Sequence, residues 1–334
     1  MKIIKILLLG GTNFIGRNLI EQLLLNKGYE LTMFNRGITN ADLFPEVNRI
    51  QGNRESDDIS QILNTEWDYI IDLSCYFPGS LNQIVSNLKH PPKKYIFIST
   101  CSVYDNEQCT EILREETTPI LKCTEAQKTD ESMNTYGNRK AECERVLSRS
   151  SFNYTIFRPA LVYGKYDSSD RLYYWLHQVK NKATLLLPES GERYFSTTYV
   201  HDLVRCIIQQ ISPNESRRVF NVITTPKTSI LQLVNVSKKL LHTRPATQNI
   251  DANFLNKNNI APWMDMPLWL NADYFTYSNE QSINELSFVP TSFEKAIADT
   301  IDYFLHLNWP EPSYGISENQ RLDLLDKIRS ENTV

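Results

Sequence analysis

The sequence predicts an α/β fold with a doubly wound parallel sheet, followed by a smaller mixed α/β domain. A short apolar run at residues 6–9 leads directly into a glycine-rich turn and then an amphipathic helix. Short apolar runs and helical patterns go on alternating as far as about residue 165, as in sheets covered by helices on both faces. We expect a first domain over 1–165, to which 199–224 return, and a second domain from the remainder of 166–334.

Composition narrows the classes of protein. The formal net charge of −4 and the pI near 5.8 give no sign of a basic nucleic-acid footprint, so no nucleic-acid partner is expected. The apolar runs are too short for a membrane helix. Five scattered histidines make a zinc site unexpected, and no metal is predicted. The six cysteines show no C-x-x-C spacing and predict reduced thiols in a cytoplasmic protein: Cys75, Cys101, Cys109, Cys123, Cys143 and Cys206.

The turn after the first strand predicts a dinucleotide-binding site. Its glycines let backbone N–H groups approach a pyrophosphate at the helix N-terminus. The spacing is Gly10-x-x-Asn13-x-x-Gly16, and Asn13 is expected to take a positive φ because asparagine tolerates it best among non-glycine residues. The predicted cofactor contacts here are Gly10, Thr12, Asn13, Phe14, Ile15 and Gly16.

The end of the second strand, residues 30–34, sets the expected cofactor type. Enzymes that use NAD usually carry an acidic residue there, which bonds the ribose 2′-hydroxyl. Here the strand is followed by Asn35 and Arg36, and a guanidinium suits a 2′-phosphate. We therefore predict NADP(H), with NAD(H) as the alternative.

Further along the chain, three residues combine into a candidate catalytic set. Thr100 follows a predicted strand at 94–98, and a long polar loop is expected over 105–135. Tyr136 and Lys140 then lie four apart on one face of a predicted helix. Chance alone supplies about one such pair in this composition, so its weight comes from its position in the chain.

These motifs together resemble the extended and atypical branches of the short-chain dehydrogenase/reductase superfamily, the NAD-dependent epimerase/dehydratase family with its nucleotide-sugar enzymes. The glycine turn is similar to the family's G-x-x-G-x-x-G, and residues 94–104 are similar to its strand ending in V-Y-G. Residues 158–164 resemble R-P-x-x-V-Y-G, 199–204 resemble V-x-D-L-A, and 286–297 resemble the family's C-terminal ending.

The resemblance implies a Rossmann-like fold and a role for each candidate residue. Tyr136 would be the acid or base, Lys140 would lower its pKa and hold the nicotinamide ribose, and Thr100 would orient the reacting carbonyl. Further cofactor contacts would be Asn53, Leu73, Ser74, Pro159 and Val162. Substrate contacts would fall on Ser102, Tyr104, Arg171 and Arg193.

Departures from the family's motifs favour one activity. A 4,6-dehydratase would carry Asp-Glu after the threonine, where Cys101 and Ser102 stand here. An epimerase recycles a tightly held NAD and usually has the acid that is missing at Asn35. We therefore predict an NADPH-dependent oxidoreductase that reduces the 4-keto group of a nucleoside-diphosphate 6-deoxysugar, with dTDP as the expected nucleotide and a homodimer compatible with the family.

Three alternatives stay open at this stage. C4 epimerisation of a nucleotide sugar is the nearest. The Asn35-Arg36 strand end and the helix beginning near Asp170-Arg171 also resemble an atypical branch that includes chloroplast RNA-binding proteins. The third alternative is an NADP-sensing protein without turnover.

Overall fold

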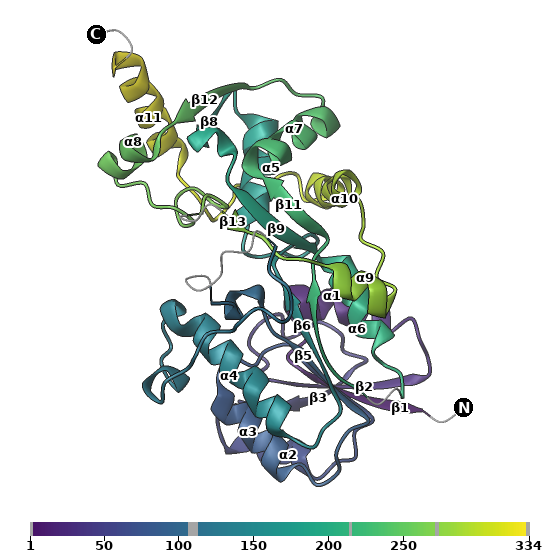
Figure 1. Ribbon diagram of the computed structural model, residues 1–334. Coiled ribbons are helices and arrows are strands. Elements are labelled where there is room, and N and C mark those ends of the chain that lie inside the picture. The colour runs from purple at the N-terminus through teal and green to yellow at the C-terminus, as the bar shows by residue number, and fades with distance from the viewer. Residues whose placement is uncertain (1–2, 106–112, 214–215, 271–273, 332–334) are drawn as a thin grey trace. The chain divides into compact units, whose positions relative to one another are not determined.

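A computed structural model describes residues 3–105, 113–213, 216–270 and 274–331, so Cys109 and part of the predicted 105–135 loop lie outside the described residues (Figure 1). The chain divides into two compact units. The first comprises Met1–Tyr166, Thr198–Thr224 and Tyr277–Pro290, and the second comprises Asp167–Thr197, Thr225–Thr276 and Thr291–Val334.

A seven-stranded sheet forms the centre of the first unit, and every neighbouring pair of its strands is parallel. The order β10-β6-β5-β4-β1-β2-β3 reverses direction at β1, which confirms the predicted doubly wound fold. The strands are β1 Ile4–Leu9, β2 Tyr29–Asn35, β3 Asn48–Gln51, β4 Tyr69–Asp72, β5 Lys94–Ile98, β6 Tyr154–Pro159 and β10 Arg217–Val222.

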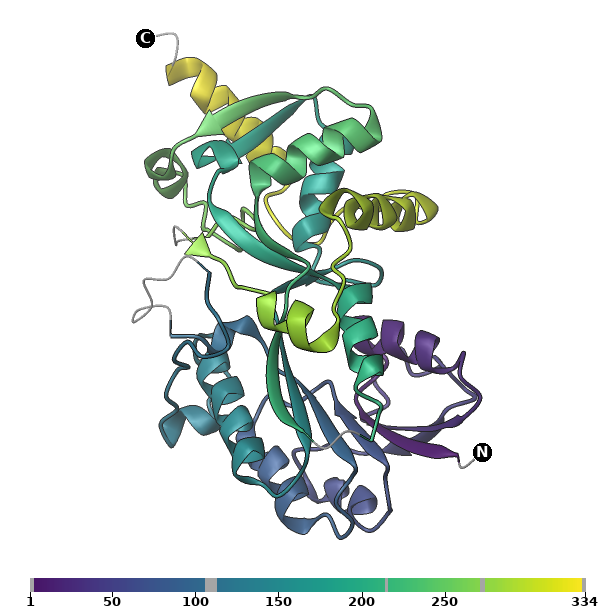
Figure 2. The ribbon, with the colours of Figure 1, turned by 45° about the vertical axis from the view of Figure 1, so that its right-hand side comes forward.

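Helices pack in pairs against this sheet, α3 beside α4 and α1 beside α6 (Figure 2). All residues of β4, β5 and β6 are buried, which explains why these strands read as near-continuous apolar runs rather than as alternating patterns. The helices of this unit are α1 Phe14–Leu23, α2 Ser60–Leu63, α3 Pro78–Asn87, α4 Tyr136–Arg149, α6 Val200–Gln209 and α9 Glu280–Leu286, and a short strand β7 spans Leu161–Tyr163.

Residues 277–290 belong to the first unit, although the sequence predicted them in the second domain. The physical reason lies at edge strand β10, whose outward backbone groups need partners. Glu116 Oε1 accepts from the amide of Asn221 (2.6 Å), and Gln281 Nε2 donates to Val219 O (3.3 Å). Ser282 Oγ donates to the carbonyl of Asn221. Side chains of α9 and the Glu116 carboxylate therefore cap the sheet edge.

The second unit is mixed α/β. Strand β8 Thr184–Pro188 pairs in parallel with β12 Ala246–Ile250, while β9 Tyr194–Tyr199 pairs with β11 Thr225–Ser229 and β13 Tyr274–Phe275. Its helices are α5 Arg171–Asn181, α7 Ile230–Leu241, α8 Ala252–Lys257, α10 Phe293–His306 and α11 Glu318–Glu331. Among the described residues, no helix is both long and apolar enough to cross a membrane.

Candidate active site

The glycine turn takes a conformation that only glycine adopts easily. Gly10 and Gly11 have φ of +104° and +121°, in the region that L side chains avoid. A Cβ on Gly16 would lie 2.5 Å from Gly11 Cα, so α1 closes directly onto the turn. Asn13 differs from the prediction: its φ is −118°, and its Oδ1 accepts from the amide of Phe14 (3.0 Å) as the N-cap of α1. The positive φ falls earlier in the turn, so Asn13 begins the helix instead of replacing a strained glycine.

Neighbouring loops hold the turn in place. Asn40 Nδ2 donates to Thr12 O (2.8 Å), and Ser74 Oγ donates to Leu9 O (3.0 Å). The amide of Leu73 also donates to Leu9 O (3.1 Å), so the exit of β4 lies directly beside the turn. Ile15 and Gly16 lie in the first turn of α1, where backbone N–H groups have no partner within the helix. We call the glycine turn at 10–13 and the first turn of α1 the glycine cradle; its backbone N–H groups suit an anionic diphosphate.

At the end of β2, Asn35 is half-buried and Arg36 is exposed. Asn35 Oδ1 accepts from the amide of Gly37 (3.0 Å), so a local turn engages the side chain that stands where NAD enzymes usually carry the acid. Gln51 Nε2 donates to Arg36 O (3.1 Å), which fixes the backbone while the Arg36 side chain is exposed. This strand end therefore carries a cationic group and no acidic one at these two positions.

Asn53 lies in the loop that follows β3. Its amide donates to Asp58 Oδ2 (3.0 Å), and its Oδ1 accepts from the amide of Glu55 (3.2 Å). Asn53 is exposed, although its amide and its side-chain oxygen both form the hydrogen bonds just described. It is thus available on the surface of the first unit, at the carboxyl end of the sheet.

Helix α4 carries Tyr136 as its first residue and Lys140 one turn later. Lys140 Nζ donates to the carbonyls of Cys75 (2.9 Å) and Ile98 (2.7 Å), at the carboxyl ends of β4 and β5. It lies 4.1 Å from the centre of the Phe97 ring and is only 3% exposed. Tyr136 is half-buried, and its ring centre lies 6.2 Å from that of Tyr76. Lys140 therefore ties α4 to the strand ends next to Ser74 and Thr100.

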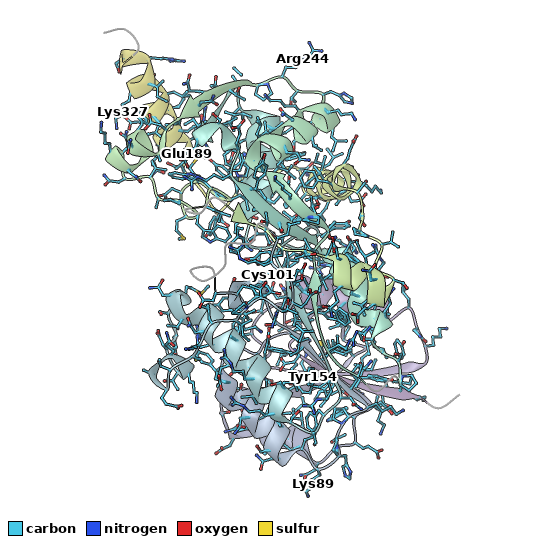
Figure 3. All side chains as sticks on the ribbon, in the orientation of Figure 1. Lys89, Cys101, Tyr154, Glu189, Arg244 and Lys327 are labelled. Carbon is cyan, nitrogen blue, oxygen red and sulfur yellow. The ribbon has the colours of Figure 1, made fainter. Side chains whose placement is uncertain are left out.

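Thr100 begins a short 3-10 turn that contacts the start of α4. Thr100 Oγ1 accepts from the amide of Ser102 (3.1 Å) and donates to Ser102 Oγ (3.2 Å). Between them, Cys101 is buried and its Sγ donates to Arg158 O (3.3 Å) (Figure 3). A Cβ on Gly137 would lie 2.2 Å from Ser102 O, so glycine lets α4 approach this turn closely. The structure thus brings Thr100 and Ser102 to the helix that carries Tyr136 and Lys140.

Tyr104 is a core residue, contrary to its predicted place at the substrate. It is 1% exposed, its hydroxyl donates to Asn221 Oδ1 (2.6 Å), and Arg158 Nη1 donates to it (3.0 Å). Burial raises the pKa of this phenol well above its ordinary value. Arg158 also forms a buried ion pair with Glu144 (2.6 Å) on α4, whose carboxylate accepts from Ser99 Oγ (2.5 Å). These groups fix the end of β6, where Pro159 is buried and Val162 beyond it is half-buried.

The two arginines predicted to contact substrate lie in the second unit. Arg171 begins α5, its Nε donates to Ser169 Oγ (3.0 Å), and its guanidinium carbon lies 5.1 Å from the Trp263 ring centre. Arg193 pairs with Glu189, labelled in Figure 3 (Nε to Oε2, 2.6 Å), which also accepts from Trp269 Nε1 (2.7 Å). Glu189 therefore already neutralises the Arg193 guanidinium.

A buried ion pair between Arg54 and Asp72 was missed from the sequence. The sequence feature that could have indicated it is Asp72 within the apolar run 69–73, because a buried carboxylate needs a buried partner. The partner, one residue beyond Asn53, could not be found from spacing. Within the described ranges, no group of three or more His, Cys, Asp or Glu side chains is arranged to hold a metal ion.

Comparison with protein families assigns the chain. Residues 6–222 match the family model described as NAD dependent epimerase/dehydratase family. The match includes the glycine turn, the Thr100 segment, α4 and β10. The chain therefore belongs to this family, as the sequence motifs predicted.

Individual relatives are more distant. The chloroplast stem-loop binding protein of 41 kDa b from Arabidopsis thaliana is 26% identical over 236 residues, which cover 65% of this chain and 58% of that protein. The UDP-glucose 4-epimerase of Thermotoga maritima has a TM-score of 0.71 at 18% identity, covering 91% of this chain and 100% of that one. The UDP-glucuronic acid 4-epimerase of Bacillus cereus, solved with NAD, has a TM-score of 0.68 at 18% identity, covering 91% and 99%. At these identities the two structures show a shared fold.

Proposed function

We propose that this protein is an NADPH-dependent reductase of a nucleoside-diphosphate 4-keto-6-deoxysugar, with dTDP as the expected nucleotide. The observation that carries the proposal is the contact between α4 and the ends of β4 and β5. Because of this contact, the helix that carries Tyr136 and Lys140 lies against the Thr100–Ser102 turn. The glycine cradle lies beside the same β4 exit. The glycine turn and the Tyr136, Lys140 and Thr100 side chains therefore lie at the same carboxyl end of the sheet, which supports the proposal.

The side chains fit the proton chemistry of carbonyl reduction. When bound, the reduced nicotinamide supplies the hydride to the carbonyl carbon. The oxygen then needs a proton, which Tyr136 donates, and Thr100 Oγ1 orients that oxygen by a hydrogen bond after its hydrogen turns away from Ser102 Oγ. Two of the three Lys140 donors are used by backbone carbonyls, so one remains for the cofactor ribose or Tyr136. The ammonium favours phenolate and supports proton release.

Arg36 supports NADP(H) over NAD(H). Its backbone is fixed by Gln51, its side chain is exposed, and Asn35 is engaged with Gly37. A guanidinium in this place pairs with a 2′-phosphate, while an NAD enzyme would place a carboxylate there.

Epimerisation is the second candidate, because the two solved relatives described above are named 4-epimerases. It would use the same residues, with Tyr136 taking and later returning the 4-hydroxyl proton, while the C4 hydride would pass to a bound oxidised nicotinamide and return to the opposite face of the sugar. An RNA-binding role is favoured by the name of the Arabidopsis relative and by the likeness of the Asn35-Arg36 strand end to the branch that includes chloroplast RNA-binding proteins.

One experiment separates these activities. The purified protein is incubated with a panel of nucleoside-diphosphate 4-keto-6-deoxysugars and NADPH, and the loss of absorbance of the reduced nicotinamide is followed together with product NMR. Stoichiometric NADPH consumption with a 4-hydroxy product supports the reductase. An inverted sugar from UDP-glucose or UDP-glucuronic acid without net cofactor consumption would replace it by the epimerase. Filter binding to stem-loop RNA without any turnover would replace both.

A further inference from the structure

Arg54 and Asp72 form an ion pair in the interior of the first unit. Arg54 Nη1 lies 2.6 Å from Asp72 Oδ1, and Nη2 lies 3.0 Å from Oδ2, so the contact is bidentate. The two residues are 8% and 0% exposed. A pair of this kind gives little net stability, because removing two charges from water offsets most of their attraction. Its presence therefore calls for a role besides stability.

The Asp72 carboxylate accepts hydrogen bonds from three residues. Besides Arg54, Tyr95 OH donates to Oδ2 (2.6 Å) and the amide of Ser74 donates to Oδ1 (3.2 Å). Burial would raise the pKa of Asp72, but the Arg54 charge and these hydrogen bonds outweigh it, and the pKa lies below its ordinary value. The carboxylate is thus ionised, and it fixes the backbone at Ser74.

The arrangement continues on both sides of the pair. Ser74 Oγ donates to Leu9 O (3.0 Å), and a Cβ on Gly10 would lie 3.3 Å from Ser74 Oγ. On the other side, Arg54 Nε donates to Ser80 Oγ (3.2 Å), which donates to Glu55 Oε1 (2.9 Å). One buried pair therefore connects the glycine turn to the loop that carries Asn53.

We infer that Arg54 and Asp72 are positioning residues for the adenine half of the cofactor, because they fix the loop at Asn53 relative to the glycine turn. This inference rests on the proposed nucleotide function. Asn53 follows Gly52, whose amide donates to Asn35 O (3.0 Å), so its loop lies beside the strand end that carries Arg36. The ribose whose 2′-phosphate Arg36 is proposed to bind also bears the adenine. Asn53 precedes Arg54 directly, so the ion pair that anchors Arg54 also sets the place of Asn53. In this proposal the bidentate pair holds the two loops in one relative geometry, which apolar side chains in its place would leave less defined.

The test separates positioning from stability. The double variant Arg54→Met/Asp72→Leu replaces the pair by apolar side chains and avoids leaving one buried charge alone. Tyr95→Phe is the milder variant, since it removes only one donor to Asp72. Lys93→Met is the matched control, because it breaks the 2.8 Å pair with Asp68 at the amino end of β4 and β5, away from the cradle.

Two probes are measured on each folded variant, NADPH and reduced nicotinamide mononucleotide, which lacks the adenine half. We expect the double variant to unfold at a temperature close to that of the wild type, to bind NADPH at least about tenfold more weakly, and to bind the mononucleotide within about twofold of the wild type. Tyr95→Phe should show a smaller loss for NADPH alone. Unchanged NADPH affinity in the folded double variant, or equal losses for both probes, would overturn the inference.

Hydrogen exchange of the protein without ligand gives a readout that is independent of the cofactor. Amide protection at Ser74, Gly10 and Asn53 should fall in the double variant and stay unchanged in Lys93→Met. If the wild type bound neither nucleotide, the proposed function and the cofactor role of the pair would fail together, and the exchange result would decide only whether the pair holds the Asn53 loop and the glycine turn. Retained protection at these three amides would then overturn it.

Discussion

Replacing Arg36 by alanine tests the cofactor choice that the end of β2 predicts. The variant removes an exposed guanidinium and leaves the local backbone intact. Gln51 Nε2 donates to the backbone carbonyl of residue 36, and Asn35 Oδ1 accepts from the amide of Gly37, so neither contact needs the Arg36 side chain. NADPH and NADH differ only in the 2′-phosphate. The variant should therefore lose affinity for NADPH and keep its affinity for NADH.

The size of the loss follows from the kind of contact. A hydrogen bond between charged groups contributes about 1.5–3 kcal/mol, which corresponds to roughly 10- to 150-fold in dissociation constant. The Arg36 side chain is exposed, so salt screens it and the lower part of that range is expected near physiological ionic strength. Raising the salt concentration should narrow the difference between wild type and variant.

The assay is fluorescence titration of both reduced cofactors against wild type, Arg36→Ala and Lys27→Ala. Lys27 is an exposed cation that precedes β2 at its other end, so its variant changes net charge equally without touching the predicted phosphate site. The reasoning is refuted if Arg36→Ala weakens NADPH and NADH equally, or if Lys27→Ala causes the same loss for NADPH.

Two further predictions concern packing and pH. Gly137→Ala should lower both thermal stability and turnover, because its Cβ would lie 2.2 Å from Ser102 O. Gly79→Ala in α3 is the control: its Cβ would meet nothing within 4 Å, so it should be neutral or stabilising by up to ~1 kcal/mol. Thermal unfolding and activity assays compare the two variants. Because the pKa of Asp72 is lowered in the folded state, its contribution to stability is full above its ordinary value of 3.8 and is lost as pH falls below that value toward the folded pKa. Denaturant unfolding at stepped pH should show this acid-side decline in the wild type and a weaker decline in Asp72→Asn, which should also cost about 3–5 kcal/mol at neutral pH because it leaves Arg54 unpaired. An equally steep decline in Asp72→Asn would contradict this assignment.

Periodicity and turn chemistry were sufficient to predict the fold of the first unit. The apolar runs of β1, β4 and β5 are buried on both faces. Strands of a parallel sheet that are covered on both faces appear in a sequence as such continuous apolar runs. The role of 277–290 could not be predicted, because side chains rather than a strand cap the edge of β10. Similarly, Ser229 caps α7 although the adjacent Thr228 is an equally suitable residue type, a choice between neighbours that sequence patterns do not resolve.

Within the candidate site, the glycine turn was predictable because a backbone requirement selects the residue type, as the positive φ of Gly10 and Gly11 shows. The roles of Tyr136 and Lys140 stay predictions, because their spacing does not say what they bind. Tyr104 was placed wrongly because a motif fixes a position in the chain but not the direction of a side chain, and here Asn221 and Arg158 bind its hydroxyl in the core. The partnership of Arg54 with Asp72 was invisible because it depends on a contact between distant segments.

Turnover of Tyr136→Phe tests the central claim most directly. The variant keeps the ring that lies beside Tyr76 and removes only the hydroxyl that we assign as proton donor. With the substrate and NADPH identified by the panel above, turnover should fall ~10²–10⁴-fold while NADPH affinity stays nearly unchanged. Tyr76→Phe, in the neighbouring aromatic ring, should stay within a few-fold of the wild type. Near-normal turnover in Tyr136→Phe would contradict the account and assign the proton to another group.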